Sequence, residues 1–318
     1  MQNKDMPTDE IIFKVLTLDG GGAKGFYTLG ILRELEAAAG KPLAQFFDAI
    51  YGTSTGAIIA TLLGLGRSVP DTLKLYEAHV PKILGAKDAE AKSAQLKATA
   101  EELFKGLGWG DFKTAIGIVA TNWTAERPLI FKNKLEAAHG MKATFIPGFG
   151  CTVPEAVRAS CSATPFFEPC KLELKNDGKI EARDGGFSAN NPALFALTDV
   201  LNGHRIPPPN VRLLSLGVGH YPEPDRGWIK QKINELPPVH LLQKTLNINA
   251  NTTDILTRYL LPNVPNIRIS DRFEAPELAT DFLETDMNKL NLLVQKGRDS
   301  FSKRESELNK FFNNYGKI

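Results

Sequence analysis

The apolar positions near the start of the chain form short segments that alternate with glycine-rich turns. Residues 13–18 are a β-prone run, and a turn rich in glycine follows at residues 20–25. After this turn, leucines recur at helical spacing over residues 26–39, and Gly40 supplies a stop signal. The pattern predicts a strand that enters a helix through a tight glycine turn.

The same succession returns directly afterwards. A second β-prone run covers residues 46–51, and a glycine-flanked turn covers residues 52–56. An apolar segment at residues 57–65 then indicates a buried helix. Two consecutive strand–turn–helix units are typical of α/β layering with parallel strands, so the sequence predicts an α/β fold.

Further strands and helices follow along the middle of the chain. Strands are expected over residues 116–121, 179–183 and 211–216, and helices over residues 85–110 and 153–160. The first of these helices is rich in Ala, Lys and Glu, which is typical of a helix on the protein surface.

The chain shows no linker that would mark a domain boundary. We therefore expect a polar tail over residues 1–12, one α/β domain over residues 13–270, and a C-terminal helical extension over residues 271–318 packed on the same domain. In this extension Gly297 interrupts the helical pattern, at a cost of about 1 kcal/mol relative to alanine. Apolar stripes of this kind usually pack inside a protein, although they also suit docking on a membrane.

Composition and charge exclude several classes of protein. The 318 residues are 42% hydrophobic and carry a net charge of only +2, which excludes global disorder. The 38 Lys and Arg nearly balance the 36 Asp and Glu, so a nucleic-acid polymer bound through a basic face is not expected as a partner. The best apolar run, residues 57–65, is much shorter than the roughly 20 residues of a membrane span.

Cysteine usage and the N-terminus both predict a cytoplasmic protein. The three cysteines, Cys151, Cys161 and Cys170, are odd in number and show no Cys-x-x-Cys spacing. Neither a metal site nor a disulfide framework is therefore expected. Residues 1–10 are polar and lack the basic flank and apolar core of a secretory signal.

A candidate nucleophile stands in the second glycine turn, where residues 52–56 read Gly-Thr-Ser-Thr-Gly. A sharp turn of this kind between a strand and a helix lifts the Ser54 hydroxyl above the sheet and aims the N–H of Thr55 at a reacting carbonyl. The helix N-terminus behind the turn favours developing negative charge. A tight turn with a capping serine would explain the motif alone equally well.

The first glycine turn permits two interpretations. Residues 20–25 satisfy the Gly-x-Gly-x-x-Gly fingerprint of a dinucleotide-binding module, which also needs an acidic residue at the end of the second strand. Asp48 lies inside that predicted strand instead. We favour the other interpretation, in which the N–H groups of Gly20, Gly21 and Gly22 form an oxyanion hole beside the candidate serine.

A base for the serine is offered by residues much later in the chain. Asp184 ends a predicted strand and precedes two glycines, which allow a close approach to another group. Because the ordinary pKa of aspartate is about 3.9, such a base needs desolvation or a short hydrogen bond, and a turn-capping aspartate is the structural alternative. His220, after the strand at residues 211–216, would instead complete the Ser–His–Asp triad of an esterase or thioesterase. An exposed loop histidine is the more common occurrence at such a position.

The two glycine turns and the downstream aspartate together resemble the patatin-like phospholipase family. The matching segments are residues 19–25, 52–56, 184–186 and 190–192, in the same order, and weaker similarity extends over residues 13–270. The resemblance implies a three-layer α/β/α fold with a mainly parallel central sheet. It also implies hydrolysis of lipid acyl esters by a Ser–Asp dyad, with no metal or organic cofactor.

The resemblance assigns roles to individual residues. Ser54 would be the nucleophile, Asp184 the general base, and residues 20–22 the oxyanion hole, with Lys24 and Asn190 in support. The family usually has arginine where this chain has Lys24, and lysine keeps the charge but loses the bidentate hydrogen bonding. The expected substrate is a membrane glycerophospholipid, met at the inner face of the membrane. Some bacterial members are antiphage effectors, so a cyclic nucleotide activator is a further candidate partner.

Overall fold

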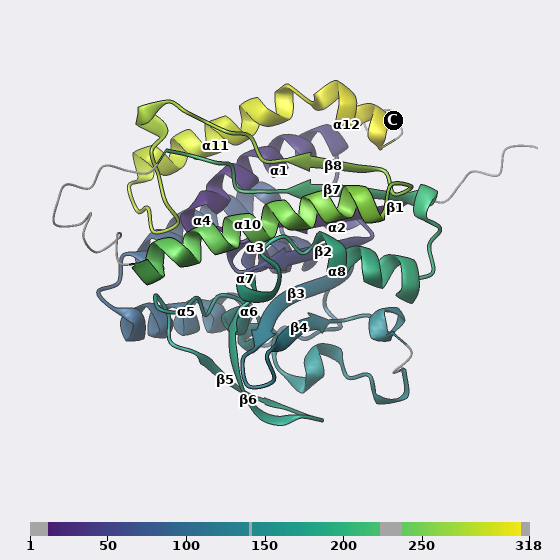
Figure 1. Cartoon of the computed structure of the whole chain (residues 1–318), viewed down its shortest axis with the longest axis vertical. Helices are drawn as coiled ribbons and strands as arrows, with labels where there is room; N and C mark the ends of the chain where they lie inside the picture. The colour runs from purple at the N-terminus through teal and green to yellow at the C-terminus, as the bar shows by residue number, and fades with distance from the viewer. Residues whose placement is uncertain (1–11, 140–141, 223–236, 313–318) are drawn as a thin grey trace, which may run out of the picture.

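The computed structural model describes residues 12–139, 142–222 and 237–312, and these residues form a mixed eight-stranded sheet with helices on both faces (Figure 1). The strand order is β5-β6-β3-β2-β1-β7-β8, with β4 pairing with β3 off this path. Strands β3, β2, β1, β7 and β8 run parallel, whereas β4, β5 and β6 join by antiparallel pairing. The strands are β1 (Phe13–Leu18), β2 (Ala49–Thr53), β3 (Ala115–Asn122), β4 (Arg127–Lys132), β5 (Cys170–Leu174), β6 (Gly178–Asp184), β7 (Val211–Leu216) and β8 (Asn266–Ile269).

Helices cover the two faces of the sheet and complete three layers. One face packs on α1 and α3, while α8 and α10 lie over the other, where α10 crosses in front of the strands in Figure 1. The predicted α/β/α fold with a mainly parallel centre is therefore confirmed. The helices are α1 (Gly25–Ala39), α2 (Leu43–Phe46), α3 (Thr55–Gly64), α4 (Val69–Leu84), α5 (Ala89–Phe104), α6 (Val153–Ser160), α7 (Gly186–Ala189), α8 (Ala193–Thr198), α10 (Pro237–Leu260), α11 (Met287–Ser302) and α12 (Glu305–Phe311).

Most predicted strands are present, and one of them is displaced. β1 and β7 coincide with their predicted ranges, and β3 and β6 are each one residue longer at both ends. The strand predicted over residues 46–51 begins only at Ala49, because the chain first forms the short helix α2. Phe46 and Phe47 pack their rings edge-on against Phe312, which keeps them out of the sheet. Their β-propensity is thus overridden by tertiary packing.

The C-terminal apolar positions are packed inside the molecule rather than displayed. The apolar face of α11 is buried against α1, which in turn lies on the sheet. A side chain on Gly30 would overlap the carbonyl oxygen of Val294, and one on Gly297 would overlap the carbonyl oxygen of Tyr27. The two glycines therefore allow the helices to approach closely. The tail predicted over residues 1–12 lies, apart from residue 12, outside the described residues.

Candidate active site

Ser54 stands on a strained turn between β2 and α3. Its backbone has φ 54° and ψ −126°, a conformation that L-residues rarely adopt and that costs about 1–3 kcal/mol. The turn is tight enough that a side chain on Gly52 would overlap the carbonyl oxygen of Gly56, and one on Gly56 would overlap that of Leu18. The geometry of the predicted nucleophile turn is thus present, with the serine presented at the carboxyl end of β2.

The register of β3 brings Asp184 to the same place. Thr53, the last residue of β2, pairs with Val119 of β3. The next residue of β3, Ala120, pairs with Asp184, the last residue of the antiparallel strand β6. Strands β2 and β6 therefore pair with successive segments of β3, and both strands end where these two segments meet. Two residues that are 130 positions apart in the sequence meet for this reason.

The hydroxyl of Ser54 donates a hydrogen bond of 2.6 Å to Oδ2 of Asp184. The other carboxylate oxygen accepts a bond of 2.7 Å from the N–H of Gly186, so both oxygens are held. Burial raises the pKa of Asp184 to about 6, and the bonds from Ser54 and Gly186 oppose this effect. A carboxylate with this pKa is ionised near neutral pH and is a much better proton acceptor than an ordinary aspartate.

The end of α6 holds both members of the pair. The hydroxyl of Ser160 accepts a hydrogen bond of 2.9 Å from the N–H of Ser54 and donates one of 2.5 Å to the carbonyl of Val119. The carbonyl of Ser160 accepts from the N–H of Gly185, and that of Ser162 accepts from the N–H of Asp184. Sequence reasoning did not single out Ser160, because no local pattern shows that this fully buried hydroxyl faces Ser54.

The glycine loop after β1 lies against the serine, but its N–H groups are not equivalent. The N–H of Gly20 donates to the carbonyl of Asn190 at 3.1 Å, and the side-chain amide of Asn190 donates back to the carbonyl of Gly20 at 3.2 Å. The N–H of Gly21 donates to Oγ1 of Thr55 at 3.3 Å. For the N–H of Gly22 no such acceptor is found within the described residues, and the N–H of Thr55 lies in the first turn of α3, where helices leave donors unused.

A buried ion pair anchors the same loop. Asp19, at the start of the loop, accepts a hydrogen bond of 2.8 Å from Nη1 of Arg268 on β8, and the second nitrogen of the guanidinium contacts the second carboxylate oxygen. Arg268 also donates to the hydroxyl of Ser215 at 2.8 Å. Both members of the ion pair are nearly inaccessible to solvent. Asp19 belongs to the matched motif, whereas no signal in the sequence identifies Arg268 as its partner.

A cavity of about 350 Å³ is lined by Ser54 and Asp184, and its volume suits a small-molecule ligand or part of a lipid. Lys24, Asn190 and His220 contribute polar groups to the lining, together with the residues of the glycine loop. Burial lowers the pKa of Lys24, and the negative charge of Asp281 opposes this effect. The apolar part of the lining is formed by Ile58, Val80, Ile83, Leu84, Leu96, Phe166 and Phe167.

His220 lies in this cavity but is not joined to the serine. Ser54 and Asp184 are bonded to each other, and no hydrogen bond from either reaches His220 in the described part of the chain. Burial, and then the positive charges of Lys24 and Arg272, lower the pKa of His220. The imidazole is therefore neutral at pH 7, and the geometry gives no support to a Ser–His–Asp triad.

The dinucleotide interpretation also lacks its second element. Asp48 precedes β2 at the amino end of the strand, where its carboxylate accepts a hydrogen bond of 2.7 Å from the N–H of Lys14. β2 ends at Thr53, so no acidic side chain stands at its carboxyl end to hold a ribose. Two of the three N–H groups that a pyrophosphate would need are already engaged within the protein.

Comparisons with known proteins identify the family of the chain. The family model described as "Patatin-like phospholipase" matches residues 16–197. The chain is 49% identical over 300 residues to a cUMP-AMP-activated phospholipase of Escherichia coli, covering 94% of each protein. It is 33% identical over 205 residues to a cGAMP-activated phospholipase of Pseudomonas aeruginosa, covering 59% of this chain and 56% of the relative.

A solved structure adds evidence for the fold. Human GIVD cytosolic phospholipase A2 aligns with a TM-score of 0.54 at 8% identity, covering 99% of this chain and 61% of that one. Within the described ranges, no group of His, Cys, Asp and Glu is placed to hold a metal ion, and no helix has the length and apolarity to cross a bilayer. The family match and the E. coli relative are decisive: the chain belongs to the patatin-like phospholipases and is a hydrolase of lipid esters.

Proposed function

We propose that the protein cleaves carboxylic ester bonds of membrane glycerophospholipids, with Ser54 as nucleophile and Asp184 as general base. The observation that carries this proposal is the hydrogen bond of 2.6 Å between the two side chains, both of which line a cavity that is partly apolar. The serine is held in the strained backbone conformation of a nucleophile turn, and the carboxylate has a pKa near neutrality. An acyl chain fits the apolar lining of the cavity.

In the first half of the reaction, Oγ of Ser54 attacks the ester carbonyl while its proton passes to Oδ2 of Asp184. The carbonyl oxygen gains negative charge, which the N–H groups of Gly22 and Thr55 stabilise. Removing one such donor typically raises the barrier by about 2.7–4 kcal/mol. Gly20 and Gly21, whose N–H groups are already bonded, shape the loop instead.

The tetrahedral intermediate then collapses, and Asp184 passes the proton to the leaving alcohol, a lysophospholipid or the corresponding glycerol derivative. The acyl–enzyme is formed, which completes the first half. A water molecule then enters, Asp184 takes one of its protons, and the oxygen attacks the acyl carbonyl. The tetrahedral intermediate collapses, the proton returns to Oγ of Ser54, and the fatty acid leaves.

The dyad is tested by covalent labelling and by turnover. A fluorophosphonate should label Ser54, identified by mass spectrometry of the peptide, and Asp184→Asn should abolish hydrolysis of phosphatidylglycerol vesicles. His220→Gln serves as the test of the competing triad. If this variant loses all turnover while Asp184→Asn keeps it, the proposed dyad is wrong.

The outward face of α10 supports contact with a membrane. Leu241, Ile248 and Tyr259 lie seven or eleven residues apart, which places them on one side of the helix, and a helix rises about 27 Å over this distance. Ile248 also lines the catalytic cavity. We call the following six exposed residues the α10 stripe: Leu241 (66% exposed), Ile248 (62%), Ile255 (53%), Leu256 (40%), Tyr259 (79%) and Leu260 (66%).

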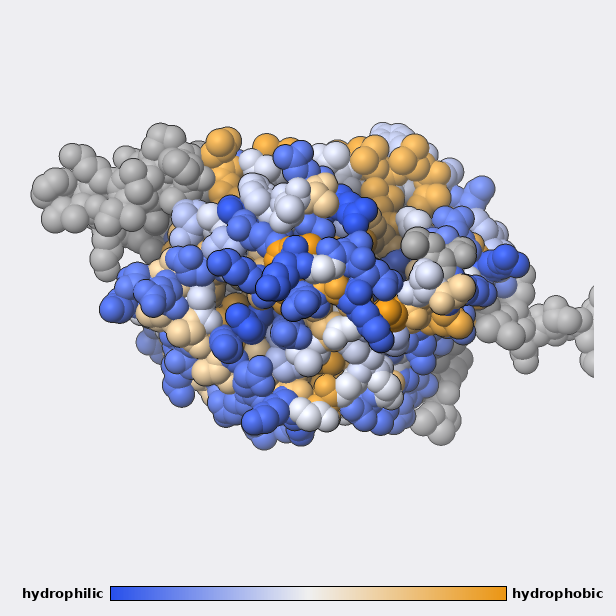
Figure 2. Space-filling view, turned by 90° about the horizontal axis from the view of Figure 1, so that it is seen from below, coloured by the Kyte–Doolittle hydropathy of each residue, from blue (hydrophilic) through white to orange (hydrophobic). Residues whose placement is uncertain are grey.

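The α10 stripe is placed where a bilayer could deliver substrate. Figure 2 shows hydrophobic residues along the upper edge of the molecule. This edge corresponds to the side that faces the viewer in Figure 1, where α10 lies. The stripe adjoins the cavity, so a lipid could enter without crossing much water. We propose that the protein acts from the cytoplasm on the inner face of the membrane, where its three buried cysteines stay reduced.

A matched pair of variants tests the membrane contact. Leu256 of the α10 stripe and Leu292 of α11 have nearly equal exposure, 40% and 42%. Leu256→Ser should weaken co-sedimentation with phosphatidylglycerol vesicles several-fold, because it removes apolar area from the contact, whereas Leu292→Ser should not. Equal vesicle binding by the two variants would contradict the proposal.

We also propose that a cyclic nucleotide activates the enzyme, as the names of its two bacterial relatives state for those proteins. Adding cUMP-AMP or cGAMP to the hydrolysis assay should raise the rate, and an unchanged rate with both would contradict activation by either.

The antiphage role implied by the family resemblance predicts that cells expressing the wild type, but not Ser54→Ala, resist phage in a plating assay.

A further inference from the structure

The cavity carries cationic and hydrogen-bonding groups that the hydrolysis of an ester does not use. Lys24, His220 and Arg272 all line it, although they come from three separate segments of the chain. His220 follows β7 and Arg272 follows β8, so both stand at the carboxyl ends of adjacent parallel strands. Ligand sites of α/β proteins gather at such ends.

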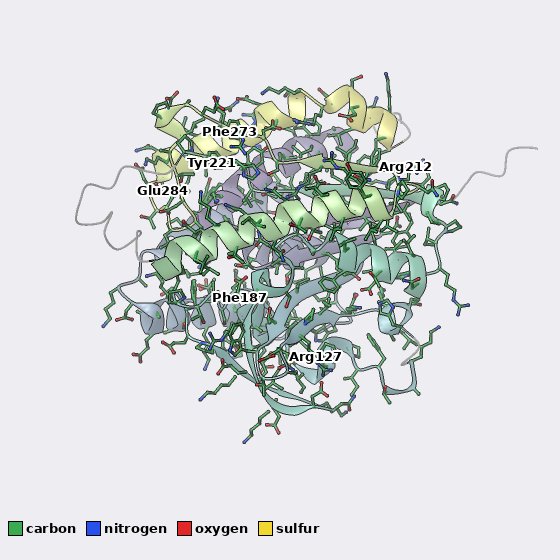
Figure 3. The ribbon with its side chains drawn as sticks, in the orientation of Figure 1. Arg127, Phe187, Arg212, Tyr221, Phe273 and Glu284 are labelled. Carbon is green, nitrogen blue, oxygen red and sulfur yellow. The ribbon has the colours of Figure 1, made fainter. Side chains whose placement is uncertain are left out.

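Backbone hydrogen bonds place His220 and Arg272 beside each other. His220 and Arg272 form an isolated β-bridge, in which the N–H of His220 donates to the carbonyl of Asp271 at 2.9 Å. The N–H of Phe273 donates to the carbonyl of His220 at 2.8 Å. The rings of Tyr221 and Phe273 then stack at 5.2 Å between centroids, and Figure 3 shows them side by side. These bonds fix the backbone from which the imidazole and the guanidinium project.

The cavity is lined by charged groups of both signs, which are Lys24, Lys244 and Arg272 and the carboxylates of Asp184 and Asp281. Among the described residues, Arg272 makes no side-chain hydrogen bond or ion pair, in contrast to Arg268, whose charge is neutralised by Asp19. Burial lowers the pKa of His220, and the positive charges of Lys24 and Arg272 lower it further, so the imidazole is uncharged. An uncharged imidazole still supplies one N–H donor.

We propose that Arg272, His220 and Lys24 form a site for a phosphodiester group. The guanidinium and the ammonium supply charge, the imidazole supplies a hydrogen bond, and the bidentate geometry of arginine suits a phosphate. As a deepening of the proposed function, on which it rests, this site favours a phospholipid over an uncharged ester with the same acyl chains. The same chemistry is present in the cyclic nucleotide that we propose as activator, so the experiment has an arm for each source.

Binding is measured by calorimetry on the full chain carrying Ser54→Ala, so that no substrate is consumed. The probes are monomeric dihexanoylphosphatidylglycerol, uncharged dihexanoylglycerol and cUMP-AMP. Adding Arg272→Gln should weaken binding of a phosphodiester probe about tenfold or more and leave dihexanoylglycerol unchanged. Arg272→Lys should restore part of the loss, because it keeps the charge. Arg127→Gln is the matched control, since Arg127 is exposed on β4 and lies far from Tyr221 in Figure 3.

The three probes distinguish the possible occupants of the site. A loss confined to phosphatidylglycerol identifies the lipid headgroup as the occupant, a loss confined to cUMP-AMP identifies the activator, and a loss of both identifies a shared site. The proposal is overturned if Arg272→Gln binds all three probes as the parent does, if it weakens dihexanoylglycerol equally, or if the parent binds neither phosphodiester. Hydrolysis of phosphatidylglycerol by the wild type is measured separately, so failure of the proposed function is recognised independently.

Discussion

Asp184→Asn should stabilise the fold while it abolishes catalysis. Burial raises the pKa of Asp184 to about 6 from an ordinary value of 3.8, so the folded protein holds this carboxylate ionised at a free-energy cost. At about 1.4 kcal/mol per pKa unit, that cost is about 3 kcal/mol. Because the folded-state pKa is the higher one, the cost is complete above about pH 6 and is relieved as the pH falls toward 4. The variant has no charge to hold and should be the more stable protein at pH 8.

Urea unfolding at pH 8 and pH 5 measures this difference. The gain in unfolding free energy should be up to about 3 kcal/mol at pH 8 and about half as large at pH 5, where much of the aspartate is already protonated in the fold. An asparagine keeps the neighbouring hydrogen bonds, since its oxygen accepts from Gly186 and its amide reaches Oγ of Ser54. Asp177→Asn is the control, because its exposed carboxylate should shift stability by less than about 0.5 kcal/mol.

Two results would refute the reasoning about Asp184. Equal stability of Asp184→Asn and the wild type at pH 8 would mean that burial does not penalise this carboxylate. A gain in stability that is the same at pH 5 and pH 8 would mean that its origin is packing rather than ionisation. In either case, desolvation would not explain how Asp184 becomes able to accept the proton of Ser54.

Three further predictions follow from the site and the fold. The kcat/KM for a soluble ester should rise with pH through an apparent pKa of about 6, because the base acts when ionised, and His220→Gln should not move this limb. Ser160→Ala should lower kcat and, in thermal unfolding, cost about 1–3 kcal/mol, because the N–H of Ser54 loses its acceptor; an unchanged Tm would argue against this anchor. Gly30→Ala should destabilise the protein by about 1–3 kcal/mol or more, whereas Gly110→Ala, in open space, should not.

The parts of the site that depend on neighbouring residues could be predicted from the sequence. A glycine-flanked serine between an apolar strand and an apolar helix specifies its own turn, so Ser54 and Thr55 lie where the motif indicates. Asp184 is similar, because the end of a strand before two glycines is a local signal. What the sequence does not show is that these segments share β3 as a neighbour, since pairing between distant strands leaves no local pattern.

Contacts between distant segments account for what could not be predicted. The partner of Asp19 is Arg268, and only the folded sheet brings the two together. Which N–H groups of the glycine loop remain available depends on Asn190, which again is a long-range contact. Gly297 illustrates the same limit, because helical spacing marks it as an interruption, whereas the structure shows that its missing side chain makes room for α1.

The proposed dyad couples catalysis to strand alignment. Because side chains alternate between the faces of a sheet, a slip of one residue between β6 and β3 would turn the Asp184 carboxylate to the wrong side. Such a molecule would keep its helices and most of its apolar core, and its circular dichroism would change little. During refolding, the turnover per molecule would therefore report the fraction of molecules that have the native strand alignment. Circular dichroism would overestimate this fraction, because misaligned molecules give nearly the same signal.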